Sequence, residues 1–460
     1  MAFRFVLQPV MAGIAALHDG IEDAKSRRSA YCWTLLTNLL ERGGRLREGL
    51  ISTARVILLR LCMDVIYQLI VLKTFYPGEA VVVAIAIAFF PHLLLRGPIA
   101  RIARWRAILA ASVLFHGTVP SANSEPNVLS PTRTYRVTRP FTDDGGRVAM
   151  NISGLACMPA DGGRSKCLVI DDQGRFAQIA IVGDGQVAAG ARLPLVGKKA
   201  SNDTVGRPPA QIGCSGGKAK FKDIDGEAVA YSSPFFYVVG GHGCTRYSNK
   251  FRSSAFILAR IPEAQVIGAS SDQKFVFDPS SVTTTYRLSE ALTSVPQIRP
   301  YFTQDLMTAN GLNIEGLVVA GGKLLAGLRA PTLDAKAFVI AVSIDKLFEG
   351  TLISEGDVRV IPVPLGIGRG IRDLAPLGDG KLLVLSGPAQ DERIPFEIHV
   401  LDTADETSTL LGTLSELEET PDGKAEAISV LSHRGKIIDL LMMFDGLESG
   451  GPRQYRILIE

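Results

Sequence analysis

A short pattern recurs five times in the C-terminal three quarters of the chain. The copies are NISGLACM at 151–158, DIDGEAVAY at 223–231, NIEGLVVA at 313–320, GIRDLAPL at 370–377 and KAEAISVL at 424–431. After a turn, each copy is followed by a second apolar run of strand length, and most by a third. Units of this kind cannot bury both faces of their sheet alone, and neighbouring units arranged around an axis can. The sequence therefore predicts an all-β fold, a β-propeller with five blades.

Two stretches decide how the ring is completed. The longest interval between copies contains SEALTSVPQIRPYF at 289–302, which predicts an insertion with a helix, with a sixth blade as the alternative. The terminal QYRILIE at 454–460 cannot finish a blade alone, so RTYRVTRPF at 133–141 is expected to be the outer strand that closes the ring. A parallel α/β fold is disfavoured, because no helical patterns alternate with the strands.

The N-terminal quarter has a different character. The apolar stretches at 51–72 and 80–95 are each long enough, with their flanks, to cross a bilayer as helices. A third, AILAASVLF at 107–115, follows a basic segment and precedes small residues, as in a secretory signal. We expect three regions: an amphipathic cytoplasmic segment at 1–50, an α-helical membrane region with a signal-like third segment at 51–120, and the propeller at 121–460.

The distribution of charged residues predicts the membrane topology and the localisation. Arg42, Arg45 and Arg47 precede the first span, and Arg101 and Arg104 follow the second, so both ends of this hairpin are expected to face the cytoplasm. The third segment then leads outward. The protein is expected in the bacterial inner membrane with residues 121–460 in the periplasm, or secreted after cleavage near 122–124. A basic, apolar end on a mildly acidic body also argues against a nucleic-acid partner.

The propeller region contains four cysteines: Cys157, Cys167, Cys214 and Cys244. No C-x-x-C motif occurs, which disfavours zinc and thioredoxin-type chemistry. Four cysteines in an exported domain suit an oxidising compartment and allow three pairings. Proximity within the repeat favours Cys157 with Cys167 and Cys214 with Cys244, and four buried free thiols are the alternative.

Aligning the five copies places one polar residue of each at the same position: Ser153, Asp225, Glu315, Arg372 and Glu426. The innermost strands of a propeller converge on a central channel, so these side chains are expected to form a ring near one mouth. Gathered carboxylates must be neutralised, and Ca²⁺, which prefers oxygen ligands, could bind Asp225, Glu315 and Glu426 with Asn313. The alternative is a structural ring in which Arg372 pairs with an acid.

Three further residues occupy comparable turns after second strands: Asp171, His242 and Arg329. If these turns share one face, the three side chains would meet above the channel. Arginine and histidine bind phosphate and carboxylate groups, so Arg329, His242 and the ring residue Arg372 form a candidate site for a small anionic ligand.

These residues also carry family resemblances. ISGLACMP with KCLVIDDQG, DIDGEAVAY with FFYVVGGHG, and GIRDLAPLGDGKLLVLSGP resemble the family called domain of unknown function 3616 over about 130–460. NIEGL and its relatives are more distantly similar to esterase-like phytase propellers. Both resemblances imply a secreted bacterial β-propeller. Residues 1–106, with LQPVMAGIAAL and LLLRGPIARIARW, resemble small inner-membrane proteins of rhizobial type, which suggests a fusion.

Two functions fit this sequence. In the first, the propeller is a periplasmic binding module for a small ligand or an envelope protein, anchored at the membrane. In the second, it is a phytase-like phosphoesterase or esterase, with Ca²⁺ at the central mouth. No G-x-S-x-G, H-E-x-x-H, phosphate-binding loop or dinucleotide motif is present, and no nucleophile–base pair stands out, which favours the binding module.

Overall fold

The computed structural model describes residues 127–459, apart from 211–212, 219–220, 247, 271–274, 351 and 416–422, together with five isolated residues between 61 and 78. Within that part of the chain, no helix is both long and apolar enough to cross a membrane. The predicted cytoplasmic segment lies outside the described residues, as do the predicted membrane segments except for those isolated positions.

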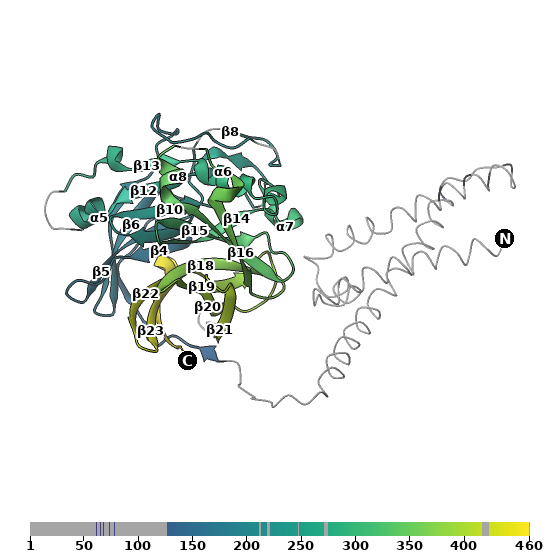
Figure 1. Ribbon diagram of the computed structural model, residues 1–460. Helices are drawn as coiled ribbons and strands as arrows, with labels where there is room; N and C mark the ends of the chain where they lie inside the picture. Colours follow the sequence, from purple (N-terminus) through teal and green to yellow (C-terminus); the bar gives the residue numbers. More distant parts are fainter. Residues whose placement is uncertain are drawn as a thin grey trace, which may run out of the picture. The chain divides into compact units, whose positions relative to one another are not determined.

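Five sheets surround a common centre (Figure 1). Blade 1 contains β4 (Ile152–Cys157), β5 (Arg164–Asp171), β6 (Phe176–Gly183) and β7 (Gln186–Pro194). Blade 2 contains β9 (Gly226–Ser232), β10 (Phe235–Gly240), β12 (Leu258–Pro262) and β13 (Thr283–Thr285). Blade 3 contains β14 (Asn313–Ala320), β15 (Lys323–Ala330), β16 (Lys336–Ser343) and β17 (Val358–Pro364). Blade 4 contains β18 (Arg369–Gly378), β19 (Lys381–Pro388), β20 (Glu397–Asp402) and β21 (Thr407–Leu414). Blade 5 contains β22 (Lys424–Arg434), β23 (Ile437–Asp445) and β24 (Arg453–Leu458).

The five repeated phrases are the innermost strands, and each contacts the next around the ring, from β4 through β9, β14, β18 and β22 back to β4. The fold is therefore a five-bladed propeller, as the sequence predicts, and the six-bladed alternative is wrong. The long interval between blades 2 and 3 holds short helices, as expected. They include α6 (Arg287–Ser294) and α7 (Leu306–Ala309), whereas α5 (Glu263–Ala269) lies within blade 2, between β12 and β13, and α8 (Ile344–Phe348) lies within blade 3. A small parallel pair, β8 (Gly217–Lys218) with β11 (Phe251–Arg252), lies beside them.

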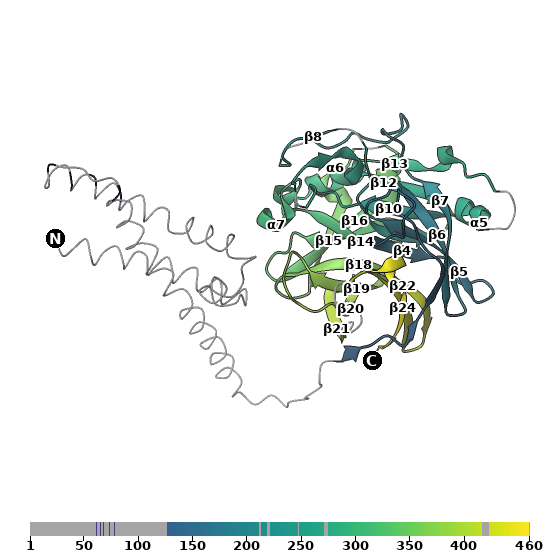
Figure 2. The same cartoon turned by 180° about the vertical axis from the view of Figure 1, so that it is seen from behind.

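The ring is closed by a segment that extends over three blades. Residues 127–139, called the rim segment here, contain β1 (Val128–Leu129), which pairs with β21, and β2 (Arg133–Thr134), which pairs with β24. They end in β3 (Arg136–Arg139), which lies parallel to β7. The predicted single outer strand at 133–141 is thus divided between blades 5 and 1. Figure 2, the view from behind, shows β1 close to the C-terminus.

The core lies between the blades because alternate residues of a strand point to opposite faces of its sheet. In β19, Leu383 and Leu385 pack against blade 5, whereas Leu382 and Val384 pack against blade 3. Both faces of the middle strands are covered in this way. Their sequences are therefore continuous apolar runs and not alternating ones.

Both predicted disulfides are present. Cys157 and Cys167 are direct partners across β4 and β5, with an α-carbon separation of 4.0 Å. Cys214, in the segment before blade 2, is bonded to Cys244, which follows β10. The second bond ties the segment that precedes blade 2 to the loop that follows its second strand.

Candidate functional site

Every innermost strand carries a β-bulge at the same place. The register of its pairing with the second strand of the blade slips by one residue, and the residue left without a partner points away from the regular ladder. These five residues, called the bulge ring here, are Ser153, Glu227, Glu315, Arg372 and Glu426. Bulges commonly re-aim a side chain at a functional site.

The bulge ring differs from the ring predicted by aligning the repeats at one residue. In blade 2 the bulged residue is Glu227, and Asp225 precedes the strand with a positive φ of 50°. The Asp-Gly of DIDGE resembles the Glu-Gly of NIEGL, which shifts the sequence alignment by two residues. The better guide is Glu227-Ala228-Val229, which matches Glu-Ala-Ile at 426–428.

The glycine of the repeated Glu-Gly pair has a steric role. A β-carbon at Gly316 would lie 2.8 Å from Leu374 of blade 4, and one at Gly154 would lie 2.8 Å from the Ala228 backbone of blade 2. These glycines allow neighbouring innermost strands to approach closely. Blade 4 has Asp373 at this position, and its carboxylate accepts hydrogen bonds from the Ile428 amide at 2.7 Å and the Leu374 amide at 2.8 Å.

A chain of buried ion pairs joins three members of the bulge ring. Glu315 contacts Arg329 of β15 at 2.8 Å and Arg372 of β18 at 2.9 Å, and Arg372 in turn contacts Glu426 of β22. All four residues are at most 7% exposed. The chain links blades 3, 4 and 5 at one mouth of the channel.

Backbone carbonyls complete the arginine contacts. The Nε of Arg329 donates to the Ala389 carbonyl at 2.8 Å, and an Nη of Arg372 donates to the Pro388 carbonyl at 3.4 Å. Burial alone would raise the pKa of Glu315, but Arg329 and Arg372 together hold it below its usual value. Burial would lower the pKa of Arg372, and its glutamate neighbours raise it instead. Glu315 and Arg372 are therefore held in their charged forms.

The other side of the mouth, called the acidic half here, contains Asp172, Asp225 and Glu227. All three are only half-buried, so solvent reaches them. Burial and neighbouring carboxylates raise the pKa of Asp172 to about 9 and that of Glu227 well above its ordinary value. The pKa of Asp225 is raised to about 6, chiefly by burial and by Asp223, against the lowering effect of Arg252 and Arg246. Glu426, between the two halves, has its pKa raised to about 7 by burial.

Asn313 lies beside Asp225 and Glu227 of the acidic half. A β-carbon built on Gly241 would meet the Asn313 amide nitrogen at 2.7 Å, an Asp225 carboxylate oxygen at 3.2 Å and the Glu227 γ-carbon at 3.3 Å. These three side chains therefore converge over Gly241, where a β-carbon would not fit. Asn313 is 8% exposed, and among the described residues its Oδ1 has no hydrogen-bond partner. The same holds for Oδ1 of Asp172.

The residues predicted to bind an anion are held by separate contacts. Asp171 accepts hydrogen bonds from the amides of Gln173 and Asn151 at 3.0 and 3.3 Å and so closes its own turn. His242 is completely buried, packs edge-on against Phe256, and donates from Nδ1 to the Gly240 carbonyl at 2.8 Å. Burial lowers its pKa to about 4, so the ring is neutral at pH 7. Arg329 and Arg372 are already paired with carboxylates, which leaves little positive charge for an anion.

The residues predicted to bind calcium lie in two different parts of the channel mouth. Glu315 and Glu426 face guanidinium groups, whereas Asp225 and Asn313 lie in the acidic half. In the described part of the chain, no group of three or more His, Cys, Asp or Glu side chains has an arrangement that could hold a metal ion. Calcium binding stays a prediction from the sequence.

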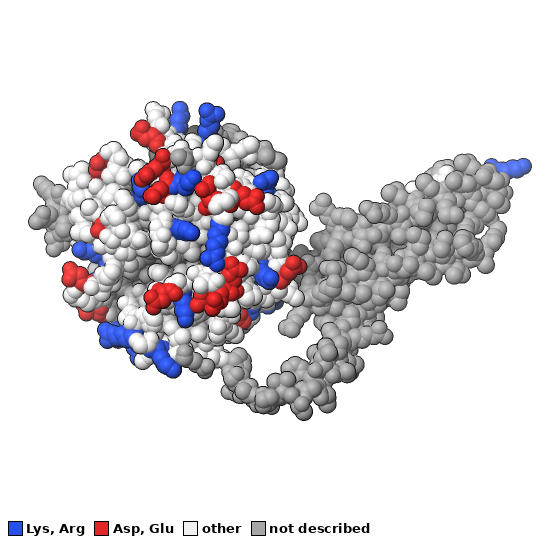
Figure 3. All heavy atoms as spheres, viewed as in Figure 1, with Lys and Arg blue, Asp and Glu red and all other residues white. Residues whose placement is uncertain are grey.

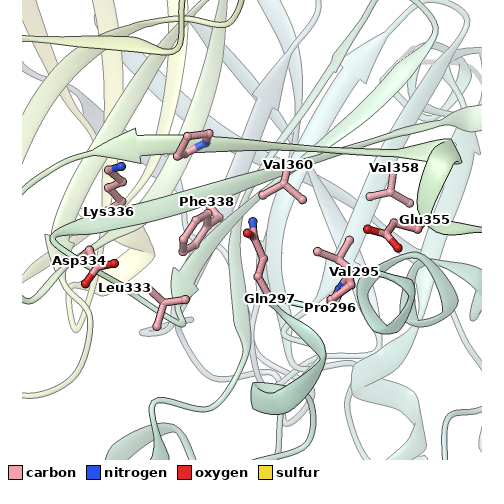
Figure 4. Close-up of a pocket in the computed structure, with 11 residues that line it drawn as sticks. Val295, Pro296, Gln297, Leu333, Asp334, Lys336, Phe338, Glu355, Val358 and Val360 are labelled. Atoms are coloured by element: carbon pink, nitrogen blue, oxygen red, sulfur yellow. The ribbon is translucent and has the colours of Figure 1, made fainter.

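Two cavities lie away from these charges. The channel beyond the bulge ring is a space of about 190 Å³ lined mainly by apolar residues, among them Leu155, Val229 and Leu317. A pocket of about 600 Å³ lies on the outer side of blade 3, and Figure 4 shows Gln297 reaching toward the strand that carries Val360. On the face in Figure 3, basic and acidic side chains are interspersed.

The protein is thus a five-bladed β-propeller with a charged mouth, and its family can be stated. The family model described as "Protein of unknown function (DUF3616)" matches residues 216–455, so the chain belongs to this family, as the resemblance implied. A search of the curated proteins finds no match.

Similar solved structures are distant. Hydrazine synthase of Kuenenia stuttgartiensis has a TM-score of 0.28 and 10% identity, covering 66% of this chain and 58% of that one. The exo-β-1,3-galactanase 1,3Gal43A of Clostridium thermocellum has a TM-score of 0.36 and 10% identity, covering 71% and 63%. The α-L-arabinofuranosidase of Lactobacillus brevis has a TM-score of 0.35 and 9% identity, covering 67% and 91%. The alignment thus spans less than two thirds of the first two proteins.

Proposed function

We propose that the propeller is a binding module of the bacterial envelope and that its ligand occupies the charged mouth of the channel. The observation that carries this proposal is the contrast between the two halves of the mouth. The arginine side is buried and its charges are paired, so it fixes the blades. The acidic half is half-buried and holds polar atoms that have no hydrogen-bond partner among the described residues. Convergent polar groups with perturbed pKa values are typical of a binding site.

A hydrolase is the second candidate, and one observation favours it. The pKa of Glu315 is lowered while those of Glu227 and Asp172 are raised, and carboxyl groups whose pKa values are driven apart are typical of acid–base catalysis. Glu315, however, is 2% exposed and bound by two arginines. A nucleophile or base in that position has no route to a substrate, so binding is the better-supported function.

Ligand screening with a matched variant tests the site. We expect members of a panel of amines, sugars, carboxylic acids and phosphate esters to raise the melting temperature of the wild-type protein. A ligand at a hundred times its Kd adds about 2.7 kcal/mol to the free energy of unfolding. Glu227→Gln should lose this shift, and Asp405→Asn, an exposed carboxyl in blade 4, should keep it. Ligands that stabilise the Glu227→Gln protein equally would place the site elsewhere, and turnover of an ester that Glu227→Gln abolishes would favour the hydrolase.

Export of the domain is testable separately. The two disulfides in the propeller support an oxidising compartment for it. We expect a reporter enzyme that is active only outside the cytoplasm to be active when fused after Ser124, and a fusion after Arg47 to be inactive. An inactive Ser124 fusion, with the protein expressed at normal level, would contradict the predicted topology.

A further inference from the structure

We propose that blade 4 carries a serine nucleophile that cleaves small carboxylic esters: Ser408 attacks the ester, His399 takes up the serine proton, and Glu397 orients the histidine. This inference goes beyond the proposed function and concerns a different site, because these residues lie on the outer strands β20 and β21, whereas the bulge ring lies on the innermost strands. No local sequence motif marks the site, since its members meet only when the two strands pair.

Strand pairing brings the three side chains to one face of blade 4. Glu397 and His399 are two residues apart on β20, so both point to the same face. β21 runs antiparallel to β20, and Ser408 lies opposite Leu401, which places the serine on that face as well. Oγ of Ser408 lies 3.3 Å from Nδ1 of His399, and a carboxylate oxygen of Glu397 lies 3.2 Å from Nε2. The serine and the carboxylate therefore contact the two different nitrogens of one imidazole ring.

The partners of the ring assign its proton. Glu397 is also in an ion pair with Arg369 at 2.7 Å, and an ionised carboxylate can only accept hydrogen bonds. Nε2 of His399 therefore donates to Glu397, and Nδ1 keeps its lone pair for the hydroxyl of Ser408. A hydroxyl, a histidine base and a third group that orients the base form the usual signature of an activated nucleophile.

Two serines contact His399, and burial distinguishes them. Ser386 of β19 lies 3.2 Å from Nε2 and is completely buried, so a substrate has no access to it. His399 is 5% exposed, and the surrounding side chains hold its ring in place. Ser408, on the strand farther from the channel, is half-buried. Its Oγ is therefore the hydroxyl that a substrate can reach.

The open edge of β21 supplies two further requirements of an ester-cleaving site. Among the described residues, β1 covers this edge at Thr413 and Leu414, and no strand pairs with it beside Ser408. An open edge presents backbone N–H groups, the kind of donor that stabilises the oxygen anion formed during ester cleavage. Leu410 lies on the same face as Ser408 and is 47% exposed, so it offers an apolar contact to a short acyl chain.

The reaction balances with these groups and water. Oγ of Ser408 attacks the carbonyl carbon of the ester, and the serine proton passes to Nδ1 of His399. The bond between that carbon and the alcohol oxygen breaks, His399 gives the proton to the departing alcohol, and an acyl ester remains on Ser408. Water then attacks the acyl ester while His399 takes up a proton from it. That proton returns to Ser408 as the carboxylic acid departs.

Covalent labelling and turnover test the full chain. A fluorophosphonate labels activated serines, and mass spectrometry of the digested protein should find the label on Ser408. Hydrolysis of p-nitrophenyl acetate measures turnover. Ser408→Ala should remove the label, and Ser408→Ala and His399→Asn should each lower turnover by about a hundredfold or more. Ser432→Ala, the matched control, removes a half-buried serine that binds Asp439 in blade 5 and should change neither result.

Glu397 acts through His399 and is a positioning residue. Glu397→Gln should lower kcat by about tenfold or more while KM stays the same, because the ester still binds but the histidine ring is no longer oriented. A merely structural role would lower the melting temperature and leave kcat of the folded protein unchanged.

The inference is wrong if no serine is labelled, if the label lies on another residue, or if Ser408→Ala keeps the turnover of the wild type. Ser408→Ala removes one oxygen from a half-buried side chain and should fold, so it decides the question even where His399→Asn does not fold. Binding at the channel mouth is measured separately, by ligand-induced shifts in melting temperature that Glu227→Gln removes. The proposed function can therefore stand when this inference fails.

Discussion

Replacing Glu315 by glutamine is expected to lower the free energy of unfolding by about 3–5 kcal/mol, because it leaves buried arginines without their carboxylate. Arg329 loses its one ion-pair partner recorded in the structure and is 3% exposed, whereas Arg372 keeps Glu426. An uncompensated buried charge is far more costly than a broken pair at the surface. Urea-induced unfolding, followed by circular dichroism, measures the change.

Matched variants make this prediction specific. Glu406→Gln breaks an exposed pair with Arg359 at 3.1 Å and should cost less than about 1 kcal/mol. Glu315→Leu combined with Arg329→Met removes both charges of one pair, and apolar replacement of a buried pair is often close to neutral. The double variant should therefore be more stable than Glu315→Gln. If Glu315→Gln costs no more than Glu406→Gln, the ion-pair chain does not hold blades 3, 4 and 5 together.

The pH dependence of stability has a definite sign for this residue. The folded-state pKa of Glu315 is below its unfolded value of about 4.3, so the folded protein binds its proton less tightly. The stabilisation is present above about pH 4.3 and is lost as the pH falls through the folded pKa. Glu315→Gln should lose that part of the acid sensitivity, in addition to its lower stability at pH 7.

The blades could be predicted from the sequence because each one begins with the same phrase. Spacing and apolar runs are local properties, and the innermost strands at 313–320 and 424–431 lie close to where the pattern places them. The preferred disulfide pairing follows for the same reason, since both bonds join cysteines within one repeat and its flanks.

The site could be predicted only in part, because its geometry depends on bulges. A bulge is a slip of register between two strands, and no single residue type in the sequence predicts where it occurs. The alignment of the repeats by sequence therefore matched the Asp-Gly of DIDGE to the Glu-Gly of NIEGL and selected Asp225, although the bulge lies at Glu227. Of the two partners of Glu315, the sequence suggested Arg372 as a residue that pairs with an acid but gave no sign of the pair with Arg329. Arg329 reaches Glu315 across the β14–β15 hairpin, where two successive register shifts determine which side chains meet.

The rim segment shows a third limit. Its strands contain two to four residues each. Their partners lie far along the chain: in the pairing of β2 with β24, Arg133 lies opposite Gln454. Strands this short leave no periodic signal. Their positions are determined by two buried side chains, Leu129 and Tyr135, which fit into blades that form from distant parts of the sequence.

These two side chains are the basis of the second prediction. Leu129 is 6% exposed and packs in the core of blades 4 and 5, and a β-carbon on Gly412 would lie 2.7 Å from its γ-carbon. Tyr135 is 7% exposed, packs in the core shared by blades 5 and 1, and donates its backbone amide to the Pro452 carbonyl at 2.9 Å. Removing either side chain therefore leaves a cavity at a junction between blades.

The double variant Leu129→Ala/Tyr135→Ala is expected to lose about 5 kcal/mol or more of the free energy of unfolding. Each truncation of a buried large side chain costs about 2–5 kcal/mol, and the two sites belong to different junctions, so their effects should nearly add. Arg136→Ala, on an exposed residue of the same segment, should change stability by less than about 0.5 kcal/mol. Urea unfolding of the three proteins is the measurement. A double variant as stable as Arg136→Ala would mean that the ring stays closed without the rim segment, and that the contacts among the five innermost strands suffice to hold the propeller together.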